Sequence, residues 1–189
     1  MALSTIDPKT ALVVIDLQKG VVTLSTAHPA SEIVERSASL ATAFRRHGLP
    51  VVLVNATGRA PGRTEAGPTA VPSAPDWAEI VEQLDAQADD LRVTKQTWGA
   101  FYGTSLDADL RDLGVTQIVL TGISTSAGVE STARAAHEHG YHVVLVTDAM
   151  TDTNADAHRN SVERIFPRLG ETATTAEILE MLEKTHPGN

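Results

Sequence analysis

Short apolar runs alternate with amphipathic segments along most of this 189-residue chain. Runs rich in Val, Ile, Leu and Ala occur at residues 11–15, 50–54 and 117–121. A continuous apolar run of this length is typical of a strand that is covered on both faces, as in a parallel sheet. Between the runs the apolar residues recur at helical spacing, as they do over residues 31–47 before Gly48. The pattern predicts an α/β fold, a mostly parallel six-stranded sheet with helices on both faces in three layers.

The expected elements follow from the same patterns. Strands are predicted at 11–15, 50–54, 91–95, 117–121 and 142–147, with a weak one at 171–174. Helices are predicted at 31–47, 76–87, 105–113, 128–139, 155–166 and 176–184. Residues 56–75, rich in Gly, Pro, Thr and Ala, predict a long loop, and such loops are usually disordered or functional. No repeat or linker divides the chain, so one domain is expected over residues 1–189.

Composition excludes several classes of function. The chain has 15 Lys and Arg against 24 Asp and Glu, and a net charge of −9 argues against an extended nucleic-acid or anionic-membrane surface. It has no cysteine, which excludes disulfides, thiolate zinc sites and a cysteine nucleophile. The start of the chain lacks the pattern of a signal peptide, and no apolar run approaches the ~20 residues of a membrane span. We therefore expect a cytoplasmic protein that acts on a small molecule.

Polar and small residues follow the predicted strands where ligands bind in parallel sheets, beyond the carboxyl ends. Asp16 follows the first strand, Lys95 ends the third, and a turn of small residues at 121–128 follows the fourth. Residues 147–149, which include Asp148, are expected at the end of the fifth. A carboxylate, an ammonium group and a helix N-terminus then converge on one crevice. The plainer interpretation stays open: Asp16 caps a turn, Lys95 is solvated, and Asp148 holds a loop.

Three of these segments together resemble the isochorismatase-like hydrolase superfamily, also called the cysteine hydrolases. Residues 10–18 look like the family's first strand with its catalytic Asp, residues 93–106 like the segment with its catalytic Lys, and residues 120–134 like its nucleophile turn. The resemblance spans residue 10 to about residue 174 and implies an isochorismatase/nicotinamidase-like fold. It also implies that Asp16 and Lys95 are the catalytic pair.

Gly128 stands where the amidases of this family have their cysteine, and the chain has no cysteine elsewhere. Isochorismatases proper resemble this chain in having Gly at that position, and they cleave a vinyl ether. The resemblance implies that Asp16 is a general acid that protonates the vinyl carbon, after which water traps the oxocarbenium ion and the hemiketal collapses. It further implies that the N–H groups of Ser124 and Gly128 form an anion-stabilising turn, with a cis peptide between Ile123 and Ser124. Burial would raise the pKa of Asp16 and Lys95 would lower it, and the sequence does not decide between them.

The same resemblance suggests further contacts to substrate. Gln18 is expected to position water or substrate, Trp98 and Phe101 to wall the pocket, Thr125 to line it, and Arg59 or Arg63 to pair a substrate carboxylate. Residues 55–59 lack the Asp and His ligands of nicotinamidases, so neither a metal nor a cofactor is expected, and the resemblance implies a homo-oligomer.

Two alternatives remain open. The first is a catalytically degenerate member of the family that binds a small ligand without turning it over. The second is an amide or ester hydrolase that uses water or a hydroxyl, although no histidine is obviously placed to activate Ser124, Thr125, Ser126 or Ser131.

Overall fold

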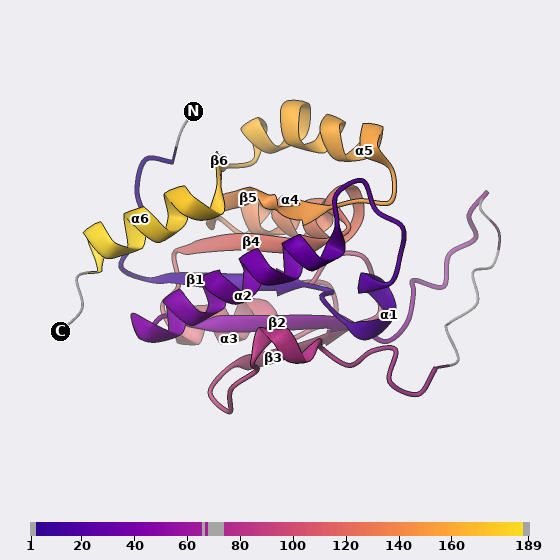
Figure 1. The fold of residues 1–189 in the computed structure, drawn as a ribbon, viewed down its shortest axis with the longest axis horizontal. Coiled ribbons are helices and arrows are strands. Elements are labelled where there is room, and N and C mark those ends of the chain that lie inside the picture. Colours follow the sequence, from indigo (N-terminus) through magenta and orange to yellow (C-terminus); the bar gives the residue numbers. More distant parts are fainter. Residues whose placement is uncertain (1–2, 66, 68–73, 187–189) are drawn as a thin grey trace.

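Six parallel strands form one sheet in the order β3-β2-β1-β4-β5-β6 (Figure 1). The structure is a computed structural model that describes residues 3–65, 67 and 74–186. The strands are β1 (Thr10–Ile15), β2 (Val51–Ala56), β3 (Leu91–Lys95), β4 (Gln117–Ile123), β5 (His142–Thr151) and β6 (Glu171–Ala173). The parallel sheet with helices on both faces confirms the predicted fold class.

Helices cover both faces of the sheet (Figure 1). One face carries α2 (Ala30–Arg46) and α6 (Thr175–Thr185), and the other carries α3 (Leu106–Asp112) and α4 (Glu130–Glu138). Along β1, Leu12 and Val14 pack into the first core, whereas Val13 and Ile15 pack into the second. Because successive side chains of a strand point to opposite faces, a strand between two cores is apolar at every position.

The strand order reverses between β1 and β4, so the chain builds the sheet outward in both directions from this pair. In sheets of this kind ligands bind beyond the carboxyl ends of the strands that flank the reversal. Gly122 of β4 has a φ of 124°, and a Cβ there would lie 2.0 Å from the carbonyl oxygen of Ile15. Only glycine permits this approach of the two backbones.

The predicted helix at 76–87 is wrong. The segment forms turns and one 3-10 turn, η1 (Glu82–Leu84). Ile80 pairs with Gln18 in an isolated antiparallel bridge, and the N–H of Val81 donates to the carbonyl of Leu17 at 3.1 Å. These tertiary hydrogen bonds use the backbone groups that a helix would need, so pairing with the end of β1 overrides the local periodicity.

Two other predicted helices are interrupted. The predicted helix at 128–139 begins as a π-helical turn, η2 (Thr125–Val129), which leads into α4. The predicted helix at 155–166 divides into α5 (Ala155–Asn160), the π-helical turn η3 (Ser161–Ile165) and the 3-10 turn η4 (Phe166–Arg168). A further short helix, α1 (Lys19–Val22), follows β1. Single π-turns are frequent at functional sites.

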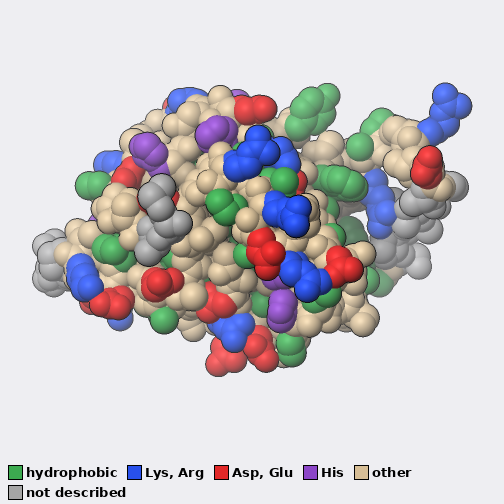
Figure 2. All heavy atoms as spheres, turned by 90° about the horizontal axis from the view of Figure 1, so that it is seen from above, with side chains coloured by type: hydrophobic (Ala, Val, Ile, Leu, Met, Phe, Trp, Pro, Cys, Tyr) green, Lys and Arg blue, Asp and Glu red, His purple; other side chains and the backbone are tan. Residues whose placement is uncertain are grey.

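The surface mixes charges of both signs. Figure 2 shows Asp and Glu side chains among Lys and Arg side chains on one face of the molecule. No helix in the described part of the chain combines the length and the apolar character needed to cross a bilayer.

Candidate active site

Asp16 lies directly beyond the end of β1, at the point where the strand order reverses. Its φ is 51°, in the left-handed region that residues other than glycine rarely adopt. The residue is 8% exposed, and its Oδ2 lies 2.7 Å from Nζ of Lys95. A buried carboxylate on strained backbone at a strand end is typical of a functional position.

Lys95 reaches Asp16 from β3, two strands away in the sheet. Its ammonium group also donates to the carbonyls of Thr97 at 3.2 Å and Trp98 at 2.9 Å. An ammonium group has three hydrogens, and all three are used by these contacts. Lys95 therefore fixes the carboxyl group of Asp16 and the chain that follows β3, and it keeps no hydrogen for a ligand.

Burial decides the protonation of Asp16. It raises the pKa of this carboxyl group from an ordinary 3.8 to about 6, although the charge and hydrogen bond of Lys95 act in the opposite direction. Oδ1 is buried and has no hydrogen-bond partner among the described residues, whereas Oδ2 accepts from Lys95. A proton on Asp16 therefore belongs on Oδ1, which leaves the contact with Lys95 intact.

Gly128 faces the same carboxyl group from η2. A Cβ at Gly128 would lie 3.2 Å from Oδ2 of Asp16 and 3.0 Å from Cγ2 of Ile15, so a side chain there would press on both. The peptide bond between Ile123 and Ser124, which opens the turn, is cis. The structure thus brings together Asp16, Lys95 and Gly128, the residues that the predicted strand ends had suggested.

Gln18 does not face the crevice as a free group. Its side chain is fully buried, and Nε2 donates to the carbonyls of Ala56 at 3.1 Å and Trp77 at 3.2 Å. Its Oε1 accepts the N–H of Ala56 at 2.8 Å. These bonds join the ends of β1 and β2 to the segment around Trp77, so Gln18 has a structural position rather than the predicted one against water or substrate.

Trp98 and Phe101, which were predicted to wall one pocket, lie in different surroundings. Phe101 is 7% exposed, belongs to the core between the sheet and α4, and stacks on His139 with ring centroids 5.1 Å apart. Packing in that core, not against a pocket, explains its place. Trp98 is 68% exposed, and it is its carbonyl group that contacts Lys95.

Arg59 and Arg63 lie in the loop that follows β2, and both are exposed. Arg59 lines a hollow of about 360 Å³ with Thr97, Tyr102 and neighbouring residues. Neither Asp16 nor Lys95 lines this hollow, but the carbonyl of its lining residue Thr97 accepts a hydrogen bond from Lys95. Arg63 makes no hydrogen bond or ion pair with the described residues and does not line the hollow.

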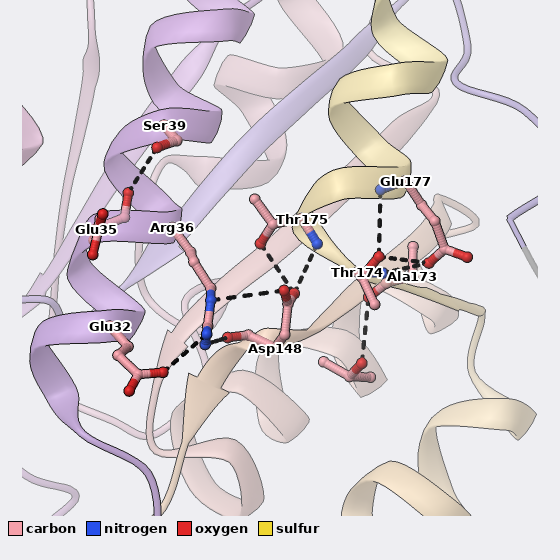
Figure 3. Close-up of polar contacts among 10 residues, drawn as sticks. Glu32, Glu35, Arg36, Ser39, Asp148, Ala173, Thr174, Thr175 and Glu177 are labelled. Carbon is pink, nitrogen blue, oxygen red and sulfur yellow. Dashed lines mark hydrogen bonds and ion pairs between the residues drawn. The ribbon is translucent and has the colours of Figure 1, made fainter.

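Asp148 points away from the crevice, contrary to the expectation for residues 147–149. The pairing of β4 with β5 shifts between Leu120 and Gly122, and β5 continues to Thr151. Oδ1 of Asp148 accepts from N–H and Oγ1 of Thr175 at 2.7 and 3.0 Å, at the start of α6 (Figure 3). Arg36 of α2 donates to the carbonyl of Asp148 at 2.7 Å (Figure 3). The irregular register explains why this carboxylate holds helices together instead.

Asp152 directly follows β5, and the sequence did not point to it because the strand was predicted to end at residue 147. The residue is 3% exposed, and its Oδ2 accepts both the N–H and the hydroxyl of Ser126, each at 2.8 Å. Asp152 therefore holds η2 from the side of β5.

His158 of α5 was also missed, because nothing in its spacing marks it. Its Nδ1 lies 2.8 Å from Oγ1 of Thr125, which is fully buried. A histidine therefore does contact a hydroxyl of the turn, contrary to the expectation that none was placed beside one. Over the described ranges, no three or more His, Asp or Glu side chains gather in a way that would hold a metal ion.

The chain is similar to known proteins over nearly its whole length. A family model for the isochorismatase domain matches residues 10–177. The isochorismatase family protein YwoC of Bacillus subtilis is 41% identical over 184 residues, which cover 93% of this chain and 95% of that protein. The solved structure of an isochorismatase family protein from Burkholderia thailandensis has 42% identity and a TM-score of 0.92, covering 95% of this chain and 98% of the other. Maleamate amidohydrolase of Pseudomonas putida is 29% identical over 186 residues, 92% of this chain and 87% of that protein.

Proposed function

Because this chain belongs to the isochorismatase family, whose members are generally hydrolases, we propose that it hydrolyses a small vinyl ether with Asp16 as general acid. The observation that carries the proposal is the state of Asp16: a buried carboxyl group, raised in pKa to about 6, with an unpartnered oxygen. A general acid works best when its pKa lies near the working pH, because it is then protonated and still able to release the proton.

The reaction begins with transfer of the Asp16 proton to the terminal vinyl carbon. The electron pair of the double bond forms the new C–H bond, and the ether oxygen donates a lone pair, which gives an oxocarbenium ion. Water adds to the cationic carbon and returns a proton to the Asp16 carboxylate. The hemiketal then breaks its C–O bond to give a ketone and an alcohol, so the acid is regenerated and no nucleophilic side chain is required.

Lys95 and Gly128 support this chemistry in different ways. Lys95 holds Oδ2 and stabilises the carboxylate formed when the proton leaves, without making the acid permanently ionised. Gly128 lets η2 pack closely against Asp16, because a Cβ there would lie only 3.2 Å from Oδ2. The absence of cysteine from the whole chain removes the thiolate route.

Arg59 is our candidate for holding an anionic end of the substrate. Arg59 lines the same hollow as Thr97, and a guanidinium fork suits a carboxylate. A substrate carboxylate held by Arg59 would lie in this hollow, whose lining residue Thr97 also contacts Lys95.

The reaction can be tested with isochorismate as a probe vinyl ether, by following pyruvate release in H₂O and D₂O. We expect turnover in which the methyl group of pyruvate gains one solvent deuteron, and we expect Asp16→Asn to lose at least about a hundredfold in kcat. Asp148→Asn is the matched control, because it makes the same chemical change at a carboxyl group that instead accepts the N–H of Thr175 in α6.

Three other outcomes would point elsewhere. Full activity in Asp16→Asn would remove the general acid. Hydrolysis of amides or esters but not of vinyl ethers would favour the alternative hydrolase, and binding without turnover would favour a ligand-binding protein.

A further inference from the structure

His158 contacts the turn that faces Asp16, yet the proposed chemistry does not use it. Its Nδ1 lies 2.8 Å from Oγ1 of Thr125, the first residue of η2. Three residues further along the same turn, Gly128 lies against Oδ2 of Asp16. The residue that contacts His158 and the residue that faces Asp16 therefore lie in one short turn.

The direction of this hydrogen bond follows from burial. The hydroxyl of Thr125 is fully buried and has no other partner among the described residues, and a buried hydroxyl hydrogen without an acceptor is unfavourable. Thr125 therefore donates to Nδ1. A neutral ring that accepts at Nδ1 carries its proton on Nε2, which is not buried and can meet solvent.

The surroundings of His158 favour this neutral ring. Burial and the neighbouring His28 lower its pKa, while Asp152 acts in the opposite direction. The rings of His28 and His158 meet edge to face with centroids 4.9 Å apart. The other charged groups on the packed elements are the exposed Asp156–Arg159 pair of α5, the exposed Glu163 and Arg164 of η3, and Glu130, which accepts from Ser161 and Arg134.

We propose that His158 is a positioning residue: by accepting the Thr125 hydroxyl it holds η2 against Asp16, and a second proton on the ring breaks this bond and releases the turn. Imidazolium has no acceptor, so Thr125 would then face a donor. This inference rests on the proposed function for its effect on rate. Activity falls on the acidic side as His158 becomes protonated and on the basic side as Asp16 ionises, which gives a bell-shaped pH profile.

A test without substrate comes first, because it separates this inference from the proposed reaction. Histidine ring nitrogens of the ¹⁵N-labelled protein are observed by NMR across the acidic pH range, with His158 assigned from its absence in His158→Asn. We expect the Nε2–H tautomer at neutral pH, and amide shifts of Ser126 and Gly128 that follow the titration of His158. An Nδ1–H tautomer would overturn the proposal, and so would amide shifts of η2 that do not change as His158 titrates.

Variants then test the effect on rate. His158→Asn keeps an acceptor, because Oδ1 of Asn takes the place of Nδ1, but it does not titrate. His158→Leu removes the acceptor, and Thr125→Val removes the donor. We expect His158→Leu and Thr125→Val to lose about tenfold in kcat with little change in KM. His158→Asn should keep kcat within about threefold and lose the acidic limb of the profile.

His142→Asn is the control for replacing a histidine, because His142 is exposed at the start of β5 and its side chain makes no hydrogen bond to the described residues. An acidic limb that survives in His158→Asn, or equal losses in Asn and Leu, would show that the ring only fills space. If a variant fails to fold, the tautomer of His158 and the titration of the η2 amides in the wild-type protein still test the proposal.

Discussion

Ionisation of Asp16 should make the protein less stable as the pH rises through the weakly acidic range. In the folded protein this carboxyl group has a pKa of about 6, whereas the unfolded chain has the ordinary 3.8. Below 3.8 both states hold the proton and the group costs nothing. Between the two values the folded state binds the proton and the unfolded state does not, so raising the pH favours unfolding. Above 6 the full cost is present and no longer changes.

The magnitude follows from the two pKa values. A tenfold change in proton affinity corresponds to about 1.4 kcal/mol, so the full cost is ~3 kcal/mol. About 2 kcal/mol of it falls between roughly pH 4.5 and pH 7.5. This is a large part of the stability of a typical domain, about 5–15 kcal/mol.

Urea unfolding at both pH values, compared between the wild-type protein and Asp16→Asn, measures this term. Asn imitates the neutral acid and leaves every other titrating group in place, so the difference between the two proteins isolates Asp16. We expect the free energy of unfolding of the wild type, minus that of the variant, to fall by ~2 kcal/mol from the lower to the higher pH. A difference that stays constant or grows would mean that Lys95 keeps Asp16 ionised, and the general-acid proposal would then fail.

Three further changes test the rest of the site. Gly128→Ala should cost ~1 kcal/mol of stability and lower kcat more than it raises KM, because its Cβ would press on Asp16 and Ile15; unchanged kinetics would contradict the close contact. Lys95→Met should raise the pKa of Asp16 further and move the basic limb of the rate profile to higher pH, since the lysine now lowers that pKa; an unmoved limb would show that the pair is not coupled. Asp148→Ala should cost ~1 kcal/mol in urea unfolding, because the N–H and hydroxyl of Thr175 at the start of α6 lose their acceptor, and should leave kcat unchanged; a loss of rate would place this carboxylate in the site.

The fold class and the two charged residues of the site were readable from the sequence because both depend on local order along the chain. Uninterrupted apolar runs mark strands buried on two faces, and Asp16 follows such a run. Lys95 ends β3, an edge strand in which polar and apolar residues alternate. Parallel strands end at the same edge of the sheet, so the convergence of these residues follows without knowledge of the strand order.

Other features of the site depend on contacts that no local pattern encodes. The predicted helix at 76–87 was lost to hydrogen bonds with residues 17 and 18, and the shifted register of β5 turned Asp148 away and brought Asp152 to η2. Gln18 was predicted to contact water or substrate, but its side-chain amide donates to the backbone carbonyls of Ala56 and Trp77.

Sequence alone therefore determined the parallel α/β architecture, the lack of any thiol, the placement of Asp16 and Lys95 at strand ends, and that of Gly128 in the turn after β4. Tertiary structure decided whether Asp16 holds a proton, because the pKa depends on how completely the surrounding segments exclude water against the pull of Lys95. It also decided that His158 meets Thr125 across 33 residues of chain, since a hydrogen bond between distant segments exists only once both are packed on the same sheet.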